Sequence, residues 1–163
     1  MKLEIDTTQS IEDIIKQVEE AKAKQEPKRW RAKEDEKYYF VTGDNKVFDI
    51  VECLSKNDNT LFLTGNYFQT KEEAEQEARL RDFEQRVAAR IKELNGDKVH
   101  KFNPGSESFS IDINLNVSSV VSRHWCDHYL GQRGWWSNRR EVIEQVIEEF
   151  GKENFIKWAK GEL

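Results

Sequence analysis

The stretch FQTKEEAEQEARLRDFEQRVAARIKELNG, residues 68–96, carries the clearest structural signal in the sequence. Thr70 and Glu73 have the spacing of a capping box, in which each side chain accepts a hydrogen bond from the other residue's backbone N–H. Asn95-Gly96 is a typical helix end. Between these limits apolar residues recur every three or four positions, as on one face of a helix: Leu80, Phe83, Val87, Ile91 and Leu94. The sequence therefore predicts a helix over residues 71–95.

Three short β-type segments precede this helix. Residues 37–42 (KYYFVT) and 46–54 (KVFDIVECL) are rich in aromatic and β-branched residues, and Gly-Asp-Asn between them supplies turn formers. A third apolar stretch, residues 60–65 (TLFLTG), follows the polar segment KNDN and is predicted as another strand. Residues 38–64 are thus expected to be mainly strand, and residues 30–97 to form a first unit of three strands and a helix.

The same order recurs in residues 98–163. FSIDINL alternates apolar and polar residues and NVSSVVSRHW continues in β-type residues, which predicts mainly strand over residues 107–130. Asn138 and Glu141 repeat the capping-box spacing, 68 positions after Thr70 and Glu73. The offset fits either an internal duplication or two independent copies of a common motif. An apolar stripe follows and predicts helix near 138–160, broken at Gly151; it consists of Val142, Ile143, Val146, Ile147 and Phe150.

Residues 1–29 are predicted to be an N-terminal amphipathic helix, near 10–25, and a linker. Ile11, Ile14, Ile15 and Val18 lie at helical spacing, and Pro27 disfavours helix at the residue before it. The helix is expected to dock on the sheet, to pair with a second copy or to stay free until a partner arrives. The predicted fold class is α+β, with two strand-strand-strand-helix units and antiparallel sheet after this helix.

Composition narrows the class of protein. The 163 residues are 35% charged and 11% aromatic, which is too aromatic for a disordered chain. No apolar run approaches the roughly 18 residues of a membrane span, and MKLEIDTTQS lacks the apolar core of a signal peptide. Two cysteines, Cys53 and Cys126, do not make a disulfide framework. We therefore expect no membrane association and a cytoplasmic location.

Motifs for catalysis and for cofactors are weak. The sequence contains no phosphate-binding glycine motif and no nucleophile elbow. His124, Cys126 and His128 would share one face of a strand and include zinc-type ligands, but a structural zinc site needs a fourth ligand. The same residues imitate a Cys-His nucleophile pair without its geometry. We therefore expect no enzyme activity, no catalytic residue, no metal and no cofactor.

Basic and aromatic residues gather near the second predicted helix. Arginine beside tryptophan offers stacking, cation–π contact and forked donors, as used in protein hot spots and in single-stranded nucleic-acid binding. The alternative is that the tryptophans lie in the core and the arginines form a solvent rim. A protein partner is preferred to nucleic acid because the net charge is −5. The predicted partner-binding residues are Arg123, Trp125, Arg133, Trp135, Trp136, Arg139 and Arg140.

The acidic ends of the chain give a further alternative. Residues 1–27 hold four lysines and seven acids, and residues 141–163 hold three lysines and six acids. Such helices would present carboxylates to a basic surface, as a nucleic-acid mimic does.

Part of the sequence resembles a known group of proteins. The chain resembles small uncharacterised phage and prophage accessory proteins of Gram-positive bacteria. The resemblance lies in Trp30, in the segments KYYFVTGDNKVFD and GNYFQTKEEAE, and in GKENFIKWAKG near the end. The resemblance implies a protein that occupies and inhibits a host protein in the bacterial host cytoplasm. In its most specific form this would be an anti-defence or anti-CRISPR factor acting on a nucleoprotein complex. It supplies no catalytic residues. A nucleic-acid-associated accessory protein and a small enzyme remain the alternatives.

Overall fold

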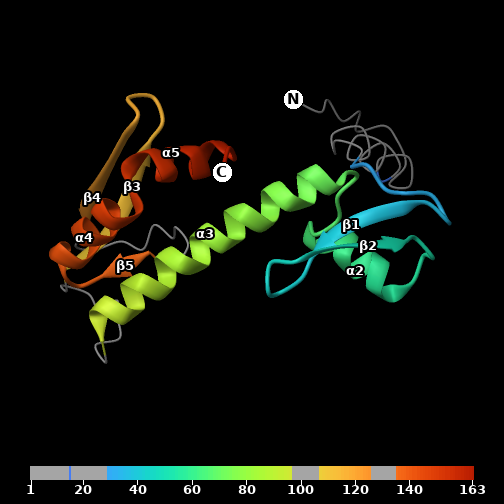
Figure 1. The fold of residues 1–163 in the computed structure, drawn as a ribbon, viewed down its shortest axis with the longest axis horizontal. Helices are drawn as coiled ribbons and strands as arrows, with labels where there is room; N and C mark the ends of the chain where they lie inside the picture. Colours follow the sequence, from blue (N-terminus) through green and yellow to red (C-terminus); the bar gives the residue numbers. More distant parts are fainter. Residues whose placement is uncertain (1–14, 16–28, 97–106, 126–134) are drawn as a thin grey trace.

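The structure is a computed structural model that describes Ile15 and residues 29–96, 107–125 and 135–163. Figure 1 shows two small sheet units with one long helix, α3, running from the first to the second. Both sheets are antiparallel, so the predicted mixture of α and β structure is confirmed. Most of the predicted N-terminal helix, residues 10–25, lies outside the described residues, as do residues 126–130 of the predicted second strand region.

The first unit is a hairpin that packs against two helices. Strands β1 (Lys37–Val41) and β2 (Val47–Val51) pair antiparallel, as predicted. The predicted third strand at residues 60–65 is wrong, because residues 60–64 belong to α2 (Lys56–Thr64) and Gly65 follows its end. The prediction that residues 38–64 are mainly strand is therefore wrong as well. Ser55 and Asp58 form a capping box that starts α2, and Gly65 ends it with φ at 85°.

The helix predicted over residues 71–95 is confirmed as α3 (Lys71–Asn95), and its capping box of Thr70 and Glu73 is formed. Its start packs beside the first hairpin, where Ala74 and Ala78 cluster with Val41. Farther along, α3 supplies core residues to the second unit. One regular helix thus connects the two units.

The second unit is a three-stranded sheet with two helices. Strands β3 (Ser108–Asn114), β4 (Ser119–Trp125) and β5 (Trp136–Ser137) have the order β4-β3-β5, with β4 at one edge. Helices α4 (Arg140–Phe150) and α5 (Lys152–Lys160) follow, separated at Gly151 as predicted.

The second predicted capping box is wrong. The residue before α4 is Arg139, and no side chain caps this helix. Asn138 instead donates from Nδ2 to the backbone carbonyl of Glu107, 2.7 Å away. The pairing of Trp136 and Ser137 with β3 accounts for the difference, since it holds Asn138 at a strand end instead of a helix start.

The two units nevertheless share a local topology. In the first, Phe68 bridges to Tyr39 of β1, so β1 lies between β2 and a short extended segment. In the second, Trp136 pairs with Ser110 of β3, so β3 lies between β4 and β5. A helix follows each extended segment directly. Among the described residues, which leave out 126–134, the inserted helix α2 of the first unit has no counterpart in the second.

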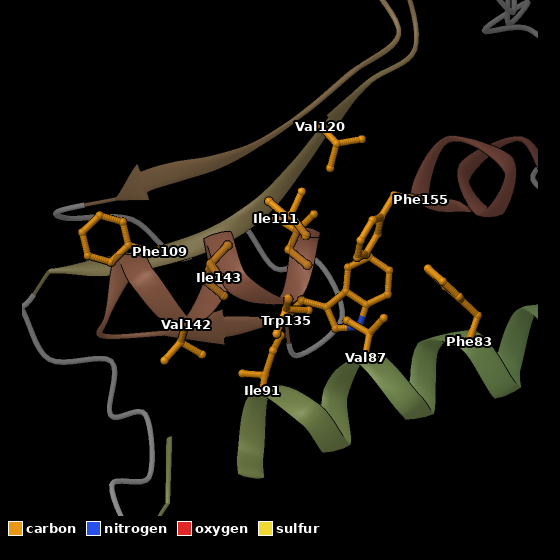
Figure 2. Close-up of a cluster of buried hydrophobic side chains, with 12 residues drawn as sticks. Phe83, Val87, Ile91, Phe109, Ile111, Val120, Trp135, Val142, Ile143 and Phe155 are labelled. Carbon is orange, nitrogen blue, oxygen red and sulfur yellow. The ribbon is translucent and has the colours of Figure 1, made fainter. Parts of the chain in front are cut away.

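The main hydrophobic core lies in the second unit. Figure 2 shows Trp135 between Val87 of α3 and Phe155 of α5, with Ile111 of β3 and Ile143 of α4 close by. The apolar stripe predicted for α4 forms part of this core, except that Phe150 is only partly buried.

Candidate functional site

Two of the three tryptophans of the predicted binding cluster, Trp135 and Trp136, lie in the core. Trp135 is 5% exposed and Trp136 is 6% exposed. The ring centroid of Trp135 lies 5.6 Å from that of Phe155 and 4.7 Å from that of Trp158. These rings therefore serve the packing of the second unit and offer little face to a partner.

The described arginines of the cluster lie at the surface in ion pairs. Arg123 on β4 pairs with Asp112 at 3.1 Å. Arg139 pairs with Glu141 at 2.8 Å, and Arg140 pairs with Glu144 at 3.2 Å. Arg133 and the side chain of Trp125 lie outside the described part of the chain. A role of the described arginines in partner binding stays a prediction.

Arg140 lies on a groove that the sequence did not indicate. The groove has a volume of about 650 Å³ and separates the edge strand β4 from α4 and the start of α5. Its apolar lining comes from Val120 and Val121 of β4 and Ile147 of α4. Charged side chains surround it, and the remaining lining residues are Ser122, Arg140, Glu144, Glu148, Gly151, Lys152 and Glu153.

The α4 wall of the groove follows from helical spacing. Arg140, Glu144 and Glu148 are four residues apart and so lie on one face of the helix. The opposite face of the helix carries Val142 and Val146 into the core. This charge repeat was the available sequence signal for the groove, but strand β4 opposite it is not predictable from the helix alone.

Ser122 contributes a polar atom to the groove lining. Its Oγ atom is buried and has no hydrogen-bond partner among the described residues. In the β3–β4 register Ser122 lies opposite Ile111, a core residue. A buried hydroxyl without a partner is uncommon because it loses its bond to water and gains nothing in return. Ser122 therefore marks a place where a ligand group would be favoured.

A second polar site, in the first unit, was also missed. Glu52 is fully buried and accepts two hydrogen bonds from Arg31, both at 3.2 Å. Tyr67 Oη donates to the same carboxylate at 2.6 Å, and the Leu54 N–H donates at 2.8 Å. Burial alone would raise the pKa of Glu52, but the hydrogen bonds from Arg31 and Tyr67 outweigh it and the pKa is lowered.

Asp58 is the other buried carboxylate. It accepts hydrogen bonds from Tyr38 Oη at 2.7 Å, Ser55 Oγ at 2.8 Å and Cys53 Sγ at 3.2 Å. Burial acts to raise the pKa of Asp58, and these donors lower it well below its usual range. The rings of Tyr38 and Tyr67 stack with centroids 3.8 Å apart, which joins the two carboxylate sites. Donors from Arg31, Tyr67, Tyr38 and Ser55 thus hold both acids, and the network ties α2 to the strands of the first unit.

The basic segment before β1 belongs to this unit. The Nη1 atom of Arg29 donates to the carbonyl of Phe62 at 2.7 Å. The guanidinium groups of Arg29 and Arg31 lie 5.3 Å and 5.2 Å from the Phe62 ring centroid. These arginines hold the segment on α2 and lie on a different unit from Arg123 and Arg140.

The predicted zinc-type trio cannot be placed, because Cys126 and His128 lie outside the described residues. His124 is on β4, with its ring stacked on Phe109 at 5.1 Å. Across residues 29–96, 107–125 and 135–163, no three His, Cys, Asp or Glu side chains are placed to hold a metal ion. None of the helices described is long and apolar enough to cross a membrane.

Comparisons of this chain with protein-family models, with curated proteins and with solved structures found no match.

Proposed function

We propose that this chain is a non-enzymatic binding protein and that the groove between β4 and α4 holds a protein partner. The observation that carries the proposal is the groove itself: an apolar floor, a charged rim and a buried Ser122 hydroxyl that makes no hydrogen bond. Protein-binding sites combine these features, with apolar contact at the centre and polar groups at the edge.

Two features favour a protein over nucleic acid as the partner. Three carboxylates line the groove, those of Glu144, Glu148 and Glu153, and they would repel a phosphate backbone. Burial of Trp135 and Trp136 removes two of the three tryptophan rings of the predicted cluster on which single-stranded nucleic acid would stack. The resemblance to phage accessory proteins extends the proposal to a host protein that the chain occupies and inhibits, in its most specific form an anti-defence role.

The test uses a matched pair of variants on one hairpin. Val121 lines the groove and is 46% exposed, whereas Val117 in the β3–β4 turn is 69% exposed and does not line it. Both accept arginine without loss of core volume, so thermal midpoints should stay close to that of the unchanged chain. We expect Val121→Arg to abolish capture of a nuclease-resistant partner from lysate, and Val117→Arg to retain it. Equal capture by both variants would place the binding surface elsewhere.

A further inference from the structure

The groove runs along the open edge of a strand. Among the described residues β4 is hydrogen-bonded to β3 on one side only. Val120, Val121 and Ser122 are consecutive, yet all three line the groove. Because consecutive strand residues point to opposite faces of a sheet, a groove that meets all three follows the strand edge, where backbone N–H and C=O groups point outward.

The floor of the groove suits a side chain of limited size. Val120 is 1% exposed and Ile147 is 5% exposed, so the floor is formed by side chains that the core already holds in place. The buried Ser122 hydroxyl lies on the same face of β4 as Val120, because the two are two residues apart. A segment lying here would cover apolar surface and supply the missing partner for Ser122.

The wall of the groove formed by α4 and the start of α5 favours a partner with positive charge. Arg140 is already paired with Glu144 at 3.2 Å. Among the described residues, neither Glu148 nor Glu153 has an ion-pair partner, and both line the groove. Of the lining residues that the structure describes, Lys152 is the only other cation, so carboxylates outnumber cations there. A lysine or arginine of the partner would complete this wall.

We infer that the groove binds an extended peptide segment that adds as a strand to β4, with an apolar side chain over Val120 and Ile147 and a cationic side chain beside Glu148 and Glu153. This inference rests on the proposed function and specifies its partner. Strand addition gives affinity through main-chain hydrogen bonds and specificity through alternate side chains.

Charge complementarity favours a peptide over a second copy of this chain. Antiparallel pairing of β4 with its own copy would place both α4 helices on the same face of the joined sheet. The carboxylates of Glu144 and Glu148 on each copy would then face each other, and like charges oppose association. A single peptide strand brings no such wall.

The experiment is a selection from a displayed library of random heptapeptides on the full chain, with the Val121→Arg variant as counter-target. We expect enriched peptides with apolar residues at alternate positions and a fixed lysine or arginine. Synthetic versions should lose about tenfold or more in affinity on Glu148→Lys and on Val121→Arg, and keep it on Val117→Arg. Backbone N-methylation at alternate positions should abolish binding, and methylation between them should not.

Ser122→Ala supplies a readout that a purely structural serine would not give. Removal of an unpaired buried hydroxyl should raise the thermal midpoint of the free chain, while the peptide should bind this variant more weakly.

Three results would overturn strand addition: no enrichment over the counter-target, enrichment of acidic peptides, or tolerance of N-methylation at every position. Self-association of the chain that Val121→Arg abolishes would assign the edge to a second copy and also overturn it. The proposed function would survive any of these results if Val121→Arg still lost the lysate partner, so the two failures are distinguishable.

Discussion

The first unit buries two carboxylates, Glu52 and Asp58, whereas the buried polar residues described in the second unit are serines around an apolar core. The apolar clusters of the first unit are small, and alanines and tyrosines make up most of them. The second unit gathers aliphatic and aromatic side chains from α3, the sheet, α4 and α5. A small unit has too little apolar surface to define its packing, and a fully bonded polar network adds the missing specificity. The two units should therefore lose stability through different substitutions and at different pH.

The largest expected effect is in the apolar core. Phe155 is fully buried and its ring centroid lies 5.1 Å from that of Phe83. Phe155→Ala should lower the free energy of unfolding by about 4 kcal/mol, because it leaves a cavity among side chains of α3 and the sheet. Phe48→Ala, at a position 50% exposed in the first unit, should cost less than about 1 kcal/mol. Urea unfolding followed by circular dichroism measures both, and equal losses would contradict this account of the core.

Asp58→Ala should cause the next largest loss of stability, and the loss should be confined to the first unit. It leaves the Tyr38 hydroxyl and the Ser55 and Cys53 N–H groups without an acceptor, which should cost about 3 kcal/mol. Hydrogen exchange should then speed up in β1 and β2 while α4 keeps its protection. Asp44→Ala, at an exposed acid paired with Lys46, is the control and should change little. Uniform loss of protection over both units would show that they unfold together.

Acid should also destabilise the first unit before the second. The folded-state pKa values of Glu52 and Asp58 are lowered from 4.5 and 3.8, so both acids contribute stability above these values. That contribution is lost as the pH falls below them toward the lowered values. Hydrogen exchange from pH 6 to pH 3 should therefore open β1 and β2 before α4 and α5. The exposed Glu149, whose pKa Arg90 lowers to about 2, contributes little because solvent screens the pair.

Asp58→Asn should reduce this acid sensitivity, since an amide does not titrate. An unchanged pH profile in that variant would assign the sensitivity to other carboxylates.

The smallest effect tests the two helix starts. Thr70→Ala removes the capping bond to the Glu73 N–H and should cost about 1 kcal/mol. Asn138→Ala, at the corresponding sequence position of the second unit, removes only an exposed bond to the Glu107 carbonyl and should cost less than about 0.5 kcal/mol. Thermal unfolding compares them, and equal costs would restore the capping role that the sequence predicted for Asn138.

Local signals in the sequence worked where one segment decides its own structure. The helix at residues 71–95 and the break at Gly151 were predictable because caps and apolar period lie within a few turns. The structure of residues 60–65 was not predictable in this way, since a short apolar run fits a strand and a packed helix equally well. The spacing of Ser55 and Asp58 was the signal that would have predicted α2.

The sequence by itself determined the mixture of α and β structure, the first hairpin and the long helix, because these depend on contacts between near neighbours along the chain. Only the tertiary structure decided that Trp135 and Trp136 are buried, that Arg31 meets Glu52, and that Ser122 lies in a groove. Each of these facts requires segments distant in sequence to meet, and the residue types alone fit either outcome: tryptophan beside arginine occurs in cores with charged rims as well as in binding sites. Burial decides whether a side chain belongs to a core or to a binding site, and it depends on how the segments pack together.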